Sequence, residues 1–177
     1  MSNGYVCPDC GLDYDTVSPP DAKVAVRSFP RRYRTALAAA FEDDADEGLV
    51  RRRPEADTWS ALEYTVHVAD LYELFANIVR RMYDESGPTI DFWDPDARAA
   101  SEGYGTADPA ATLDRLDAAA TALGTELDRV DADGWRRTAT FPFGDRDLLT
   151  MARNAVHEGT HHLRDVERVL ESARRAR

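Results

Sequence analysis

Histidine is scarce in this chain of 177 residues, and the places of its four copies give the first indication of chemistry. His67 stands alone in one segment, whereas His157, His161 and His162 lie close together near the C-terminus. Imidazole is a ligand for zinc, nickel and iron, and a carboxylate can complete the ligand set. Histidines on two segments that face each other therefore predict a divalent-metal site.

The segment 157–162 offers two pairs of side chains that are four residues apart, His157 with His161 and Glu158 with His162. Residues at this spacing project from the same helix face. At about 100° per residue, His162 lies inside the edge of the apolar arc of this helix and Glu158 borders it, whereas His157 and His161 lie on the far side. We predict that His67, Glu158 and His162 bind the metal, with His157 and His161 as the alternative pair.

Two histidines and one glutamate form a ligand set that leaves a fourth position open for water or substrate. Zinc is the metal we expect, and nickel or iron fits the same ligands. Bound zinc lowers the pKa of water to about 7, polarises carbonyl groups and stabilises thiolates. Asp70 and Asp165 each follow a predicted ligand by three residues and are candidates for hydrogen-bond acceptors that orient these histidines.

The two cysteines of the chain, Cys7 and Cys10, lie in the motif CPDCG. This motif resembles half of a zinc knuckle, which needs two further ligands. His157, His161 or a second chain could supply them. A metal-free structural turn and a redox pair are the other interpretations. Disulfides cannot be the main source of stability with two cysteines.

The elements that position these residues are predicted to be helices. Ser60 and Glu63 form a capping box at the start of a helix that runs to about Tyr83. Asp108 followed by Pro109 begins another. Further helical periods cover 21–41, with a break near Pro30, and 147–173. With no convincing strand and a long connection over 84–108, we predict an all-α antiparallel four-helix bundle at 21–177, preceded by an irregular arm at 1–20 that contains CPDC.

Composition excludes several function classes. Acidic residues outnumber basic ones by 33 to 22, and the formal net charge of −11 disfavours nucleic-acid binding. No apolar run is long enough for a membrane span, and no signal peptide is visible at the N-terminus. We therefore expect a cytoplasmic protein that acts on a small-molecule substrate, with no nucleic-acid or membrane partner. A homodimer is the oligomer we expect.

The motifs Trp59-Ser60, Glu63 with His67, and Glu158-x-x-x-His162-x-x-Asp165 resemble the DinB/YfiT-like superfamily, which includes mycothiol-dependent maleylpyruvate isomerases. The similarity spans about residues 25–173. It implies an up-down-down-up bundle with a long crossover between the second and third helices, and a divalent metal at one end. It also implies a metal-dependent thiol S-transferase or isomerase that uses mycothiol or bacillithiol as cosubstrate. The alternative is a non-catalytic, stress-associated metal-binding bundle.

Overall fold

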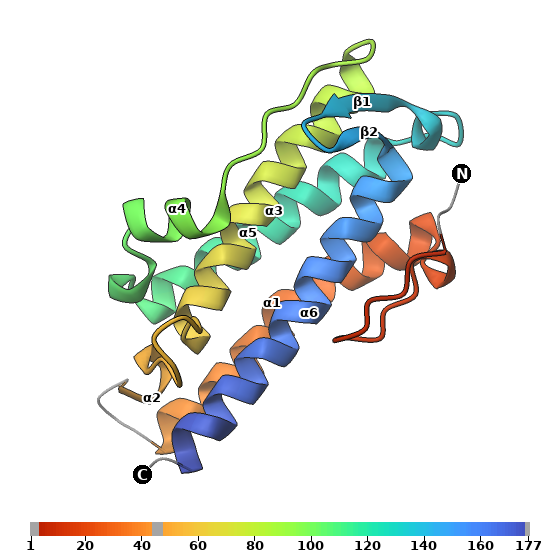
Figure 1. Cartoon of the computed structure of the whole chain (residues 1–177). Helices are drawn as coiled ribbons and strands as arrows, with labels where there is room; N and C mark the ends of the chain where they lie inside the picture. The colour runs from red at the N-terminus through yellow and green to blue at the C-terminus, as the bar shows by residue number, and fades with distance from the viewer. Residues whose placement is uncertain (1–3, 44–47, 176–177) are drawn as a thin grey trace.

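The computed structural model describes residues 4–43 and 48–175, and four long helices dominate it. They are α1 (Pro19–Asp43), α3 (Ala61–Asp84), α5 (Pro109–Arg129) and α6 (Leu148–Arg175). Helix α3 packs against α5 and α6, and α1 packs against the same two helices. The predicted all-α four-helix bundle is confirmed (Figure 1). Within the described residues, none of the helices is both long and apolar enough to span a membrane.

The directions of the helices follow the up-down-down-up order. Helices α3 and α5 run the same way, and α1 and α6 run the opposite way (Figure 1). The segment after α3 therefore returns along the outside of the bundle before α5 begins. It contains α4 (Pro95–Ser101) and a 3-10 turn, η2 (Tyr104–Thr106). The predicted crossover is thus partly helical, and it covers the side of α3 that carries the candidate site.

The predicted helix starts are confirmed by their caps. The Ser60 hydroxyl accepts a hydrogen bond from the Glu63 amide at 3.2 Å, and the Glu63 carboxylate accepts one from the Ser60 amide at 2.8 Å. These two bonds satisfy amides that a helix start leaves unpaired. At the start of α5, the Asp108 carboxylate accepts from the Ala111 amide at 2.7 Å, and Pro109 occupies the first turn.

The predicted break near Pro30 was wrong, because α1 continues through this residue. Phe29 and Tyr33, on either side of the proline, are fully buried in the core. Burial of these rings offsets the one backbone hydrogen bond that proline removes. The helix also begins at Pro19, two residues before the predicted boundary of the arm.

A small hairpin corrects the prediction that the chain has no strands. Strands β1 (Thr138–Phe141) and β2 (Gly144–Asp147) pair in antiparallel fashion just before α6. Two backbone hydrogen bonds join Thr140 to the start of the crossover, at Pro88 and Ile90. β1 alternates exposed and buried residues, but β2 has the sequence Gly-Asp-Arg-Asp with no apolar residue, so the sequence gives no clear signal for a hairpin. The remaining short elements are η1 (Tyr14–Thr16), α2 (Gly48–Arg51) and η3 (Gly134–Arg136).

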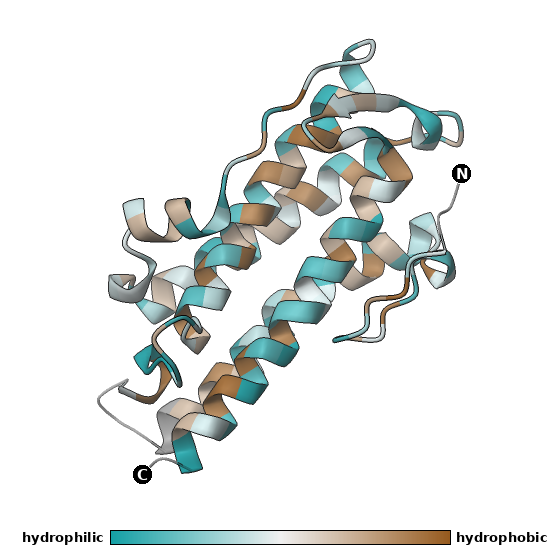
Figure 2. Cartoon of the chain, in the orientation of Figure 1, coloured by the Kyte–Doolittle hydropathy of each residue, from teal (hydrophilic) through white to brown (hydrophobic). Residues whose placement is uncertain are grey.

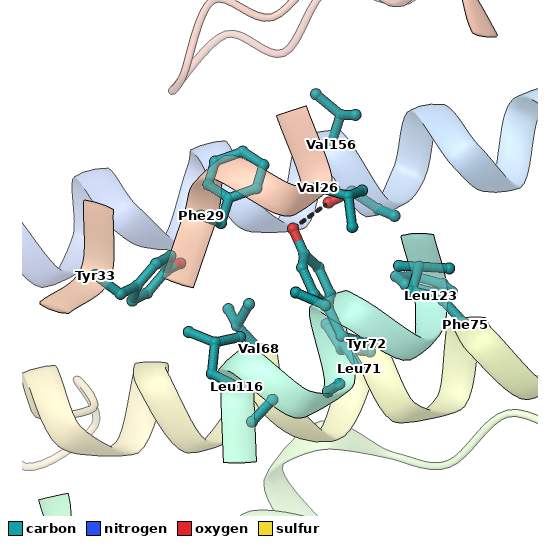
Figure 3. Close-up of a cluster of buried hydrophobic side chains, with 14 of the residues drawn as sticks. Val26, Phe29, Tyr33, Val68, Leu71, Tyr72, Phe75, Leu116, Leu123 and Val156 are labelled. Atoms are coloured by element: carbon teal, nitrogen blue, oxygen red, sulfur yellow. Dashed lines mark hydrogen bonds between the residues drawn. The ribbon is translucent and has the colours of Figure 1, made fainter. Parts of the chain in front are cut away.

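The core lies between the four helices, and apolar residues recur on the faces that the helices turn toward one another (Figure 2). Two buried tyrosines tie α6 to its neighbours (Figure 3). The Tyr72 hydroxyl donates to the Ala155 carbonyl at 3.1 Å, and the Tyr33 hydroxyl donates to the Gly159 carbonyl at 3.2 Å. A Cβ atom on Gly159 would lie 2.3 Å from the Tyr72 hydroxyl. The missing side chain at Gly159 therefore allows the close approach that sets the position of α6.

Candidate metal centre

Helices α3 and α6 bring the three predicted metal ligands together. His67 projects from α3, and Glu158 and His162 project from α6. Their ligand atoms all lie within 4.8 Å of one another. The His162 Nε2 atom is 3.1 Å from Glu158 Oε2, and the His67 and His162 ring centroids are 5.0 Å apart. We call these three residues the inner triad.

His67 is suited to metal binding by its charge and its surroundings. Its side chain is buried, and its Nδ1 atom has no hydrogen-bond partner in the part of the chain that the structure describes. Burial, and secondarily the charge of His162, lower the pKa of His67 to about 4. The imidazole is therefore neutral at physiological pH, with a lone pair available. A buried polar atom without a partner is unfavourable, and a metal ion at the triad would remove that cost.

His162 lies between two carboxylates. Its Nδ1 atom is 2.9 Å from Asp165 Oδ2, on the opposite side of the ring from Glu158. Burial alone would lower the pKa of His162, but hydrogen bonds to Asp165 and Glu158 raise it to about 9. When no metal is bound, both ring nitrogens thus carry protons at neutral pH. A metal ion at Nε2 would replace one proton, while Nδ1–H continues to donate to Asp165.

Glu158 supplies the negative charge of the inner triad. Burial by itself would raise the pKa of Glu158, but contacts with His157 and His162 hold it well below its usual range. The carboxylate is therefore ionised at neutral pH and able to bind a cation. The donor set of two imidazoles and one carboxylate fits a divalent metal such as zinc.

Aromatic rings enclose the His67 side of the triad. Trp59 lies 5.0 Å and Trp93 5.9 Å from the His67 ring, measured between centroids, both edge to face. Tyr64 stacks on His162 at 5.4 Å. Trp59 and Tyr64 come from the start of α3, close to His67 in the sequence, whereas Trp93 is brought there by the crossover. They keep bulk water away from His67 and reduce the local dielectric constant.

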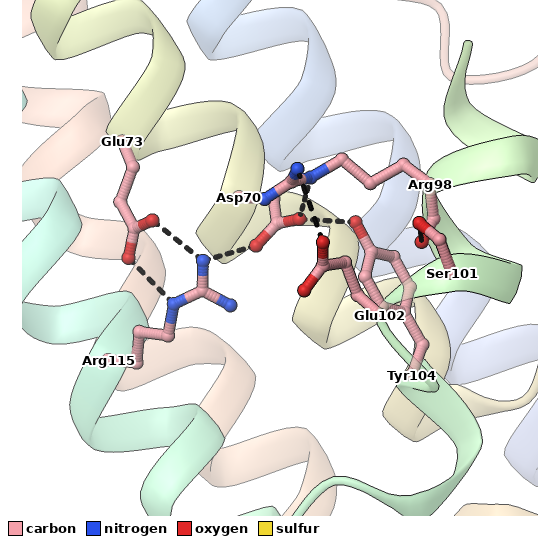
Figure 4. Close-up of polar contacts among 7 residues, drawn as sticks. All are labelled: Asp70, Glu73, Arg98, Ser101, Glu102, Tyr104 and Arg115. Carbon is pink, nitrogen blue, oxygen red and sulfur yellow. Dashed lines mark hydrogen bonds and ion pairs between the residues drawn. The ribbon is translucent and has the colours of Figure 1, made fainter. Parts of the chain in front are cut away.

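Asp70 does not take the place expected for it beside the metal ligands. Its carboxylate accepts hydrogen bonds from Arg98 Nε at 2.6 Å and from the Tyr104 hydroxyl at 2.5 Å, and it also pairs with Arg115. Arg115 extends the cluster to Glu73 (Figure 4). The side chain of Asp70 is fully buried within this group and joins α3, α4 and α5. Its role is thus to hold the crossover against the bundle.

The alternative pair, His157 and His161, does not face His67. Both rings turn toward the N-terminal arm, where Cys7 and Cys10 are buried and free of disulfide bonds. The rotation of about 100° per residue sends neighbouring positions of one helix to different sides. The pair is therefore not available to a metal ion at the inner triad, as the helical-wheel argument predicted.

Comparisons with known proteins agree with this fold. The family model of the DinB superfamily matches residues 31–166. YfiT from Bacillus subtilis, described as a probable metal-dependent hydrolase with an unusual four-helix bundle topology, is similar in structure. The TM-score is 0.78 at 17% sequence identity, over 92% of this chain and 91% of that one. A comparison with curated proteins finds no match. With the family model covering most of its length, the chain belongs to the DinB superfamily.

Proposed function

We propose that this protein binds a divalent metal ion, zinc before nickel or iron, through His67, Glu158 and His162, and uses it to activate a small molecule. The observation that carries this proposal is the number of ligands. Among the described residues, the group of ligand atoms that includes His67 has three members. Three protein ligands leave a coordination position for water or substrate, which is the arrangement of catalytic zinc sites.

Each residue of the site has a distinct part in this function. A zinc ion bound there would act as a Lewis acid and lower the pKa of a bound water or thiol. His67 offers a neutral ligand from the dry side, and Glu158 offsets part of the metal charge. Asp165 holds the His162 ring in one orientation. The side chains of Glu158 and His162 are 26% and 15% exposed, so substrate approaches from their side.

The reaction we favour is transfer or isomerisation with a low-molecular-weight thiol of the mycothiol or bacillithiol type. In the transfer, the thiol releases its proton to solvent and its sulfur forms a bond to an electrophilic carbon. The leaving group departs from that carbon with its electron pair. A metal ion at the triad would keep the thiol ionised at neutral pH, and the site would hold its sulfur close to the substrate, which favours attack.

Hydrolysis is the second candidate. It is favoured by the similarity in structure to YfiT, which is described as a probable metal-dependent hydrolase. The same open coordination position would then hold water instead of a thiol. The two reactions differ in whether turnover depends on added thiol.

The test compares metal content and turnover in matched variants. His67→Ala is expected to lose one metal ion per chain and all turnover, whereas Thr160→Ala, on the same segment of α6, retains both. Turnover is measured with chlorodinitrobenzene or maleylpyruvate plus thiol, and with ester and amide substrates without thiol. Unchanged metal content in His67→Ala would contradict the site. Metal loss without any turnover in the parent protein would favour the non-catalytic bundle.

A further inference from the structure

The N-terminal arm carries the motif CPDCG, which has no part in the proposed metal site at His67, Glu158 and His162. Residues 5–14 fold back on themselves, with a bridge between Val6 and Asp13. The Cys7 amide donates to the Leu12 carbonyl at 3.0 Å, and the Gly11 amide donates to the Cys7 carbonyl at 2.8 Å. Gly11 has a φ of +70°, a conformation that favours glycine. This turn buries both cysteines, which are 2% and 3% exposed.

The cysteines lie against the outer face of α6. The Cys7 Sγ atom is 3.5 Å from His161 Nδ1. The rings of His157 and His161, one turn apart, have centroids 5.1 Å apart. His157 Nε2 is buried and has no hydrogen-bond partner among the described residues. One ligand atom from each of the four side chains lies within 4.8 Å of all the others.

We propose that Cys7, Cys10, His157 and His161 form a second metal site, which binds zinc and fastens the N-terminal arm to α6. Two thiolates and two imidazoles are a complete tetrahedral set for structural zinc and leave no position for substrate. Sulfur and nitrogen ligands select zinc over magnesium or calcium. Binding requires both thiols to be ionised, any thiol proton still present is released to solvent, and no redox change occurs.

The second nitrogen of each histidine lies near a carboxylate on the same helix. His161 Nε2 lies 3.5 Å from Asp165 Oδ2, and His157 Nδ1 lies 3.6 Å from Glu158 Oε1. Histidine ligands of metals commonly donate their other N–H to a carboxylate, which fixes the orientation of the ring. Asp165 also contacts His162 of the inner triad, and Glu158 is itself a ligand of that triad. The two candidate sites are therefore linked through Asp165 and through Glu158.

Besides these four side chains, the arm is held by Val17 in the core, by ring contacts of Tyr5 and Tyr14 with His157, and by a few polar contacts. Arg153 Nε donates to the Val17 carbonyl at 3.0 Å, and an Arg164 nitrogen lies 3.5 Å from the Asp9 carbonyl. A segment of this length cannot bury a core of its own, and short segments of this kind commonly depend on a metal or a disulfide. Two buried cysteines beside two histidines make metal the better match.

The test uses the full chain loaded with cobalt(II), a spectroscopic substitute for zinc. Thiolate ligands give cobalt an intense charge-transfer absorption in the near ultraviolet, which imidazole and carboxylate ligands do not produce. We expect this absorption in the parent protein and in His67→Ala. In Cys7→Ser/Cys10→Ser we expect its complete loss, together with one fewer metal ion per chain. The Val6→Ala variant, altered at an exposed side chain of the same arm, should retain the absorption.

The outcomes separate this proposal from the proposed function. Loss of metal in His67→Ala with the absorption intact supports two independent sites. Absence of the absorption in the parent protein would overturn the second site, whatever the behaviour of the serine variant. A Cys7–Cys10 disulfide that persists in the purified chain under mild reductant would overturn it as well. Should the serine variant fail to fold, limited proteolysis of the parent protein with and without chelator tests the same claim, because metal removal should expose the arm to cleavage.

Discussion

The two faces of α6 carry similar side chains and present them to different partners. On the inner face, Glu158 and His162 meet His67 across the bundle; on the outer face, His157 and His161 meet Cys7 and Cys10 of the arm. The two pairs are offset by a single residue. Because of this offset, Glu158 and His162 belong to a group of three candidate ligands, whereas His157 and His161 belong to a group of four.

The difference between the faces lies in what completes the ligand set. A three-ligand group leaves room for a substrate and fits chemistry, whereas a four-ligand group is closed and fits a structural role. The inner face is also enclosed by aromatic rings, and its partner His67 belongs to α3, which is part of the core. The outer face is covered by an arm that has no core. We therefore assign reactivity to the inner face and attachment of the arm to the outer face.

Removal of the His162 side chain should abolish tight metal binding at the inner triad and leave the outer site intact. This is the largest effect that we predict. His162→Ala is expected to lower metal affinity at the triad by about 100-fold or more, since loss of a residue that merely orients a ligand already costs about 10- to 100-fold. The thiolate absorption of cobalt should remain. Competition with a chelator measures the affinity, and loss of the thiolate absorption together with the triad metal would mean that the two faces form one site.

The pH dependence of metal binding at the inner triad can be measured by itself in the Cys7→Ser/Cys10→Ser variant, which lacks the thiol ligands of the outer site. The raised pKa of His162, about 9, means that a proton competes with the metal for Nε2 below that pH. Affinity at the triad should therefore rise by about 10-fold per pH unit from about pH 7 to about pH 9, and then level off. Chelator competition, corrected for the protonation of the chelator, measures the slope. An affinity that does not change over this range would contradict the proposed protonation of His162.

Asp165→Asn should weaken metal binding on both faces, because Asp165 contacts both His162 and His161. We expect a decrease of about 10- to 100-fold in affinity at the triad, and a smaller one at the outer site. Isothermal titration of the metal-free protein would show the two changes. An effect confined to one face would show that the sites do not share this residue.

Asp70→Asn, unlike Asp165→Asn, should leave metal binding at both sites unchanged and reduce the stability of the fold. Burial alone would raise the pKa of Asp70, but hydrogen bonds from Tyr104, Arg98 and Arg115 lower it below its usual value. This stabilisation is present above the unfolded pKa of about 4 and is lost as the pH falls. The variant should cost about 2 kcal/mol of unfolding free energy at pH 7.

Chemical denaturation at pH 7 measures this cost for Asp70→Asn. The control is Glu73→Gln, which breaks an exposed ion pair of the same cluster and should cost less than about 1 kcal/mol. Equal effects of the two substitutions, or loss of metal in Asp70→Asn, would disagree with the assignment of Asp70 to the fold.

Gly159→Ala should have the smallest effect and tests the placement of α6 itself. The added methyl group would meet the Tyr72 hydroxyl and the Phe29 ring, and such overpacking costs about 1–3 kcal/mol against a gain of about 1 kcal/mol in helix propensity. Gly124→Ala is the control, because the nearest atoms that its methyl group would meet belong to the flexible end of Arg27. Thermal unfolding should show a decrease for the first variant and none for the second.

The sequence predicted the helix starts and helix faces, because each depends on residues that are close together in the chain. The capping box at Ser60 and the Asp108-Pro109 start are each set by a few neighbouring residues, and both occur as expected. The periodicity of α6 placed Glu158 and His162 on the inner side for the same reason. The continuation of α1 through Pro30 depends on burial against other helices, which no local pattern reveals.

The remaining features depend on contacts between distant segments. From the sequence, His157, His161 and a second chain were all candidate partners of Cys7 and Cys10. The sequence could not decide among them, because long-range contacts such as that between Arg153 and Val17 place the arm on α6. Asp70 has the same spacing from His67 as Asp165 has from His162, yet it faces arginines brought in by the crossover and by α5. Trp93 could not be placed beside His67 from the sequence for the same reason, because the crossover brings it there.

Anomalous X-ray diffraction at the zinc absorption edge, on crystals of the zinc-loaded full chain, tests the central claim most directly. We predict two peaks. One peak marks an ion bound by His67, Glu158 and His162, with a coordination position open to solvent. The other marks an ion bound by Cys7, Cys10, His157 and His161. A single ion bound by His67 together with His157 and His161, or no ion at the inner triad, would contradict the account.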